Sequence, residues 1–181
     1  MPAILRTLSC AALALGLVAC GDPAEINLLN ARDGQTQLTA PGGGTVSLSA
    51  SAGTLSQARV VPNPAPDAAP AGVNFDHGFY DFSVTGLTPG GSVDVTIELP
   101  AGAAPNTYYK VQNGQFTPFD FDGVEGARIT GSTVTLTLVD GGRGDDDGVA
   151  NGVVVDPGAP GTRTGGAGVT TPGTVNSSLV G

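Results

Sequence analysis

The stretch STVTLTLV, residues 132–139, alternates apolar and threonine side chains residue by residue. In an extended chain, successive side chains point to opposite faces, so Val134, Leu136 and Leu138 share one face and the threonines share the other. This pattern is typical of a strand with one buried face and one solvated face. We therefore predict a central β-strand here.

Six other stretches show a comparable strand pattern, and turn-forming residues separate them. No stretch beyond the N-terminal segment places apolar residues at helical spacing over three turns. The chain is therefore predicted to be all-β and to fold as a small antiparallel β-sandwich of immunoglobulin-like or jelly-roll-like type. The six strands are expected at residues 45–50, 55–61, 79–85, 92–99, 107–112 and 115–119.

Two short connections carry the residues that tight turns favour. Asn113-Gly114 separates two strand-like stretches by two residues, which predicts a β-hairpin. Thr88-Pro89-Gly90-Gly91 separates the stretches 79–85 and 92–99, and its Pro and Gly suit a tight turn, so a second hairpin is expected there.

The N-terminal segment has the layout of a secretion signal. Arg6 precedes an apolar run that is too short to span a membrane and that ends at Leu17-Val18-Ala19-Cys20. This ending resembles a lipobox, in which the cysteine thiol is acylated before cleavage. We expect residues 1–19 to be a lipoprotein signal peptide and Cys20 to carry lipid, palmitate included, that anchors the exported chain to the membrane. The alternative is an ordinary signal peptide with a chance cysteine.

Composition divides the remainder into three parts. Residues 20–35 are expected to form the lipidated N-terminus and a tether, and residues 36–157 to form the β-sandwich domain. Residues 158–181 are rich in Gly, Thr and Pro and contain few apolar side chains, so a disordered tail is predicted.

Charge and histidine content exclude several classes of function. The formal net charge of the chain is -9, and its few Lys and Arg residues are scattered, so nucleic acid is not an expected partner. His77 is the only histidine, which excludes a zinc site built on several histidines. We find no motif for a nucleophile or a phosphate-binding loop, and therefore predict no catalytic residues and no enzyme.

An acidic, glycine-rich loop follows the strand 132–139 and is the strongest candidate site. Calcium prefers carboxylate, amide and carbonyl oxygens, and glycine lets several of them converge. The spacing does not fit an EF-hand loop. Two interpretations stay open: a calcium site, or a solvated turn in which Asp and Asn cap their own backbone. The candidate calcium ligands are Asp140, Asp145, Asp146, Asp147, Asn151 and Asp156.

Other acidic residues need no chemical role. Asp120 and Asp122 alternate with phenylalanines and join the candidate site only if the fold brings them near. Asp94 and Glu98 are expected on the outward side of their strand. The tripeptide Arg143-Gly144-Asp145 matches an integrin-recognition sequence, which we assign to chance.

From about Phe79 to Gly158 the chain resembles the choice-of-anchor U domain, a family of bacterial surface modules. The likeness rests on FYDFSVTGLTPGG at 79–91, on Tyr108-Tyr109-Lys110, on Gly126-Ala127, and on the order of Asp, Asn and Gly residues from 134 to 158. It implies an extracytoplasmic domain of unassigned biochemical function and brings no site residues with it. Family members often end in a sorting helix with a basic tail, which residues 170–181 lack.

These observations favour a lipid-anchored module of the cell envelope with a structural or adhesive role, its acidic loop ordered by calcium if the first interpretation holds. The alternative is a module that binds an extracellular glycan, with tyrosines as stacking platforms. A protein ligand is also compatible, and a hydrolase is the least favoured option. The tyrosines concerned are Tyr80, Tyr108 and Tyr109.

Overall fold

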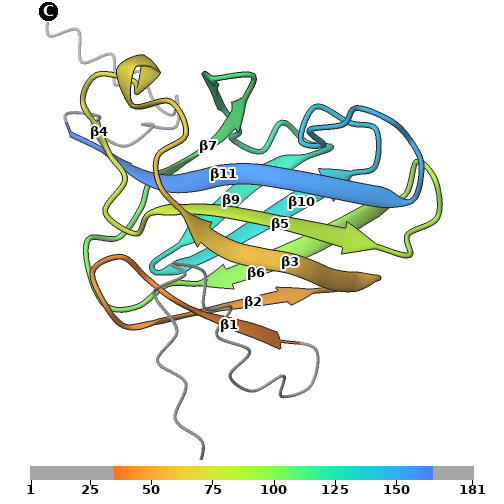
Figure 1. Cartoon of the computed structure of the whole chain (residues 1–181), viewed down its shortest axis with the longest axis horizontal. Helices are drawn as coiled ribbons and strands as arrows, with labels where there is room; N and C mark the ends of the chain where they lie inside the picture. Colours follow the sequence, from red (N-terminus) through yellow and green to blue (C-terminus); the bar gives the residue numbers. More distant parts are fainter. Residues whose placement is uncertain (1–34, 165–181) are drawn as a thin grey trace, which may run out of the picture.

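The computed structural model describes residues 35–164, which form two antiparallel sheets (Figure 1). This confirms the predicted all-β sandwich. The first sheet has the order β1 (Gln35–Thr39), β2 (Thr45–Ala50), β6 (Ser92–Glu98), β10 (Thr133–Val139), β9 (Gly126–Thr130). The second has the order β3 (Thr54–Val61), β5 (Phe79–Thr85), β11 (Val153–Arg163), β7 (Thr107–Gln112), β8 (Gln115–Pro118), and β4 (Val73–Asn74) pairs with the end of β11.

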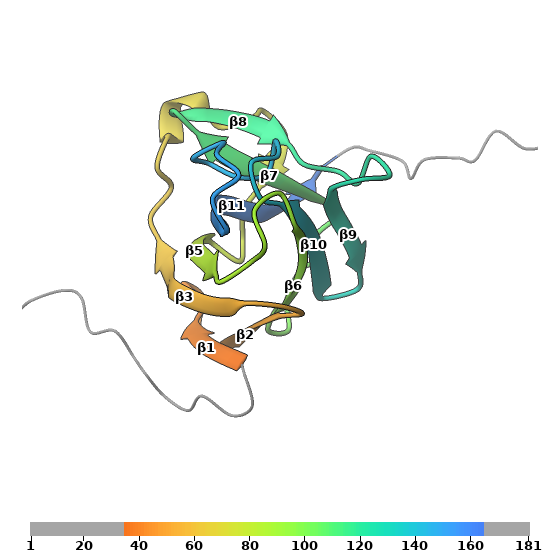
Figure 2. The same ribbon diagram turned by 90° about the vertical axis from the view of Figure 1, so that its right-hand side faces the viewer.

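The sheets face each other and enclose one main core (Figure 2). The alternation at 132–139 is confirmed, because Val134, Leu136 and Leu138 are fully buried in β10. The β10 strand lies between β6 and β9, so its threonines form part of the outer face of the first sheet. The second sheet contributes the large aromatic side chains of Tyr80, Phe82 and Tyr108, and Phe119, directly after β8, adds a fourth.

The turn at Asn113-Gly114 forms as predicted and joins β7 to β8. Asn113 has φ of 51° and Gly114 has φ of 73°. Both residues thus adopt the left-handed conformation that a two-residue hairpin turn requires and that Asn and Gly tolerate best.

The second predicted hairpin is wrong. Residues 88–91 do form a turn, with the Gly91 N–H donating to the Thr88 carbonyl at 2.7 Å. However, β5 pairs with β3 and β11, whereas β6 pairs with β2 and β10 in the opposite sheet. The turn therefore carries the chain from one sheet to the other. Local turn chemistry predicted the reversal but not which strand each arm would pair with.

The predicted end of the domain at residue 157 is also wrong. The β11 strand continues to Arg163, through Pro157 and Pro160. Proline removes a backbone donor and is normally excluded from central strands. Here Pro157 lies where β11 pairs with β5 alone, and Pro160 lies where β11 pairs with β7 alone. Each proline thus falls where β11 has a registered partner strand on one side only.

Several predictions fall outside the described residues. These are the signal peptide at 1–19, the lipidation of Cys20, the tether up to residue 34 and the tail from residue 165. At the N-terminal boundary the sandwich begins with Gln35, one residue earlier than expected. Within residues 35–164, no helix is long and apolar enough to cross a membrane.

Candidate functional site in the acidic loops

Asp140 directly follows strand β10 and joins two other segments of the chain to the end of that strand. It is 2% exposed, and its carboxylate accepts N–H groups from Gly90 at 2.8 Å, Gly152 at 2.9 Å and Asn151 at 3.3 Å. Burial opposes ionisation, but these backbone donors outweigh it and hold the pKa of Asp140 below its usual value. The ionised carboxylate therefore ties the 88–91 turn and the start of β11 to the end of β10.

Asp145 has a similar role within the loop. Its carboxylate accepts the N–H of Gly141 and the N–H of Val155, each at 2.9 Å, and the side chain is buried. Burial is the largest influence on Asp145 and raises its pKa in spite of these two donors. Asp145 thus ties both ends of the loop together.

Asp147 and Asn151 cap the exposed tip of the loop. One Asp147 oxygen accepts the N–H of Val149 at 2.8 Å, and the other accepts the Asn151 side-chain amide at 3.0 Å. Asn151 in turn accepts the N–H of Val153 at 2.9 Å. These bonds match the turn-capping interpretation, in which Asp and Asn satisfy nearby backbone donors.

The structure does not bring the six predicted calcium ligands together. Asp146 has an exposed side chain, and its backbone N–H donates to the Val155 carbonyl at 2.9 Å. The prediction that Asp156 is a calcium ligand is wrong, because its side chain lies in the interior of the sandwich. Its Oδ1 is 2.6 Å from Lys110 Nζ, and a lysine at that distance disfavours a bound cation. Among residues 35–164, no three His, Cys, Asp or Glu side chains are grouped so as to hold a metal ion.

Arg143 joins this loop to the loop at 120–125, a contact that the sequence did not reveal. Its guanidinium donates to the Asp122 carboxylate at 3.0 Å and to the carbonyls of Asp120 and Glu125, each at 2.9 Å. It also lies over the Phe119 ring, 4.5 Å from the centroid. The fold therefore brings Asp120 and Asp122 near the loop, and the guanidinium group of Arg143 provides the positive charge between the two loops.

Glu125 completes the junction from the other side. It is buried, and its two carboxylate oxygens accept the N–H of Arg143 at 2.8 Å and the N–H of Gly144 at 3.3 Å. Asp122 also accepts the N–H groups of Val124 and Glu125, both at 2.9 Å, and these donors are the main reason that its pKa is lowered. Because Asp145 is buried and Arg143 is held in place, Arg143-Gly144-Asp145 acts as a structural element of the loop.

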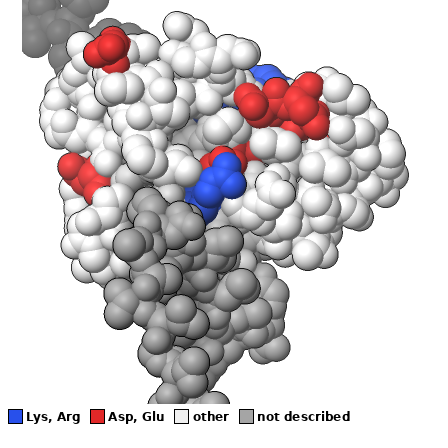
Figure 3. Space-filling model, viewed as in Figure 1, with Lys and Arg blue, Asp and Glu red and all other residues white. Residues whose placement is uncertain are grey.

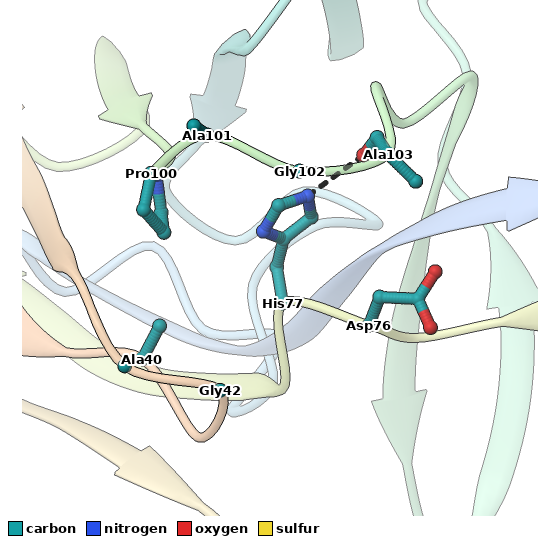
Figure 4. A pocket seen from close by; sticks show the side chains of 9 residues that line it. Ala40, Gly42, Asp76, His77, Pro100, Ala101, Gly102 and Ala103 are labelled. Carbon is teal, nitrogen blue, oxygen red and sulfur yellow. Dashed lines mark hydrogen bonds between the residues drawn. The ribbon is translucent and has the colours of Figure 1, made fainter.

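His77 lies beside a small hollow lined mostly by Gly, Ala and Pro residues (Figure 4). Its Nε2 is 2.8 Å from the Ala103 carbonyl oxygen, and its own carbonyl accepts the Tyr80 hydroxyl at 2.7 Å. In Figure 4 the Asp76 carboxylate points away from the imidazole ring. Asp76 and His77 are therefore not arranged as an acid and base pair.

The remaining candidates occupy structural positions. Asp94 and Glu98 point outward from β6 as predicted, and Asp94 accepts the Thr137 hydroxyl at 2.7 Å. The three tyrosines considered as stacking platforms are buried. The face in Figure 3 is largely uncharged, with its acidic side chains in separate groups.

Comparison with protein-family models, with curated proteins and with solved structures finds no match for this chain. Residues 35–164 form an antiparallel β-sandwich in which carboxylates of the acidic loops accept hydrogen bonds from the backbone. The resemblance to the choice-of-anchor U domain stays a prediction.

Proposed function

We propose that the chain is a non-enzymatic module of the cell envelope, anchored by lipid on Cys20, with a structural or adhesive role. The proposal is supported by the loop carboxylates, which bind backbone groups of the protein itself. Asp140, Asp145 and Glu125 are buried and each accepts backbone N–H groups, so their charges hold the fold in shape. The lipobox-like ending at Cys20 supports the location.

The role is tested in the producing bacterium by deleting the gene and restoring either the wild-type chain or Cys20→Ala. A structural role predicts that deletion raises detergent sensitivity, and an adhesive role predicts that it reduces attachment of cells to surfaces. In both cases the wild type restores the phenotype and Cys20→Ala does not. Normal detergent resistance and normal attachment in the deletion strain contradict the proposal.

Glycan binding through stacked tyrosines loses its support, since Tyr80, Tyr108 and Tyr109 are at most 7% exposed. Sugar stacking needs an accessible aromatic face.

Calcium binding at the acidic loop stays one of two open interpretations, and thermal unfolding tests it. The hydrogen bonds to Asp140 and Asp145 favour a loop that folds without a cation, so we expect the same Tm in millimolar calcium and in chelator. A ligand that binds only the folded state raises Tm by mass action. A calcium-dependent rise that Asp145→Asn with Asp147→Asn removes would contradict this expectation and establish a calcium site.

A further inference from the structure

Lys110 and Asp156 lie in close contact inside the sandwich. They come from the neighbouring strands β7 and β11, with Lys110 in register with Gly158, two residues beyond Asp156. The side chains are 1% and 0% exposed, and Nζ lies 2.6 Å from Oδ1. Nζ also lies 5.4 Å from the centroid of the Phe119 ring. Lys110 is the only lysine of the chain.

The contact between the two groups is close but is not aligned as a hydrogen bond. Within residues 35–164, Lys110 Nζ and both carboxylate oxygens of Asp156 have no hydrogen-bond partner. This contrasts with Asp140, which accepts three backbone N–H groups. A buried ion pair is favourable only with good geometry and further hydrogen bonds for both partners. An ion pair alone therefore explains this arrangement poorly.

We propose that Lys110 and Asp156 are joined by an intramolecular amide bond. The lone pair of the uncharged Nζ attacks Cγ of the protonated Asp156 carboxyl group, so that a C–N bond forms. One C–O bond then breaks, and the hydroxyl group leaves with a proton from the nitrogen as one molecule of water. No electrons are lost or gained, so the reaction needs no oxidant or cofactor.

The surroundings favour the reactive forms of both groups. Burial is the largest influence on each: it lowers the pKa of Lys110 and raises the pKa of Asp156, against their mutual attraction. Both shifts disfavour the charged forms and favour a neutral amine beside a neutral acid. The amide also replaces a buried amine and a buried carboxyl group that lack hydrogen-bond partners within residues 35–164.

Tyr108 supplies a hydroxyl group beside the reacting carboxyl. Burial is the main cause of the raised pKa of Tyr108, and the Asp156 carboxyl group adds to the rise. Within residues 35–164 the Tyr108 hydroxyl makes no hydrogen bond to any other group. Gly158 makes room for the ring, because a Cβ there would lie 2.5 Å from Tyr108 Cε1. The hydroxyl is thus available to donate to the oxygen that gains negative charge during attack.

The bond would join two central strands of the second sheet. Since β11 pairs with both β5 and β7, a covalent link from β7 to Asp156 keeps β11 attached when the chain is pulled or locally unfolded. This consequence suits a structural or adhesive module, but the chemistry does not depend on that role.

Peptide mapping of the full chain, unfolded and digested with trypsin, tests the proposal. Trypsin does not cleave after an acylated lysine, so the expected product is a branched peptide of residues 60–128 joined to 144–163. Its mass is that of the two peptides less one water molecule. Tyr108→Phe is expected to lower the branched fraction in freshly made protein.

Asp156→Ala is the matched control and should give separate peptides 60–110 and 111–128. If that variant does not fold, the wild-type digest decides alone. Free peptides 60–110 and 144–163 from wild-type protein, with no branched product, would overturn the proposal and leave a buried ion pair only.

Discussion

At the scale of single residues, the Asp140 carboxylate joins several loops at one end of the β-sandwich. Its partners Gly90 and Gly152 lie 50 and 12 residues away in the sequence, and each bond fixes the entrance or exit of a different strand. From the sequence, Asp140 was predicted as a candidate calcium ligand in a loop rich in carboxylates. The sequence did not indicate that the donors would be backbone N–H groups, because these converge only after both sheets have formed.

Asp140→Asn is expected to destabilise the domain by about 2–3 kcal/mol at neutral pH, because an amide NH₂ replaces one acceptor and faces backbone donors. Urea unfolding measures the loss. Asp147→Asn is the matched control in the same loop, and its exposed side chain predicts a loss below about 1 kcal/mol. Equal losses in the two variants would contradict the role given to Asp140.

The loss in Asp140→Asn should depend on pH in a defined direction. The pKa of Asp140 is lower in the folded chain than in the unfolded chain, so its stabilising contribution is full above the unfolded value and disappears as pH falls through the folded value. The difference in stability between wild type and Asp140→Asn should be constant above about pH 5 and shrink below about pH 4.

Local sequence patterns do not show which distant residues meet in the fold, and this explains which site residues could not be predicted. Arg143 and Glu125 are 18 residues apart, in two loops that no local pattern pairs. Lys110 shares the parity of Tyr108 in β7, which places both on the inner face, but the partner Asp156 lies in a strand that the sequence did not predict.

At the scale of elements, the alternating strands were predictable because each has one apolar face, and this requirement is local. The β11 strand was not, because its Pro and Gly residues are typical of loops. Its prolines are tolerated only because β5 and β7 pair with different halves of the strand. That arrangement is a property of the assembled sheet.

The close contact at Gly158 gives a prediction for this element. Gly158→Ala places a Cβ 2.5 Å from Tyr108 Cε1 and is expected to cost about 1–3 kcal/mol through overpacking. Gly42→Ala is the control, since nothing lies within 4 Å of a Cβ there, and its stability should stay within about 0.5 kcal/mol of wild type. Thermal or urea unfolding of both variants measures the difference, and an unchanged Gly158→Ala would contradict the packing described for β11.

At the scale of the whole molecule, the sandwich followed from the number and spacing of amphipathic strands, whereas the strand order did not. The turn at 88–91 illustrates the reason: turn residues specify a reversal of the chain, while the pairing of β6 with β2 and β10 depends on burying the apolar faces of both sheets together. The acidic, glycine-rich composition left a calcium site and a solvated turn open, and the fold uses several of those carboxylates to join its loops.

Metabolic labelling of the producing cells with a palmitate analogue tests the proposed lipid anchor most directly. We expect label on the wild-type chain and on Cys10→Ala, because Cys10 belongs to the expected signal peptide, and no label on Cys20→Ala. Unchanged labelling of Cys20→Ala, or an unlabelled wild-type chain, would contradict the lipid anchor and with it the proposed place of this sandwich in the cell envelope.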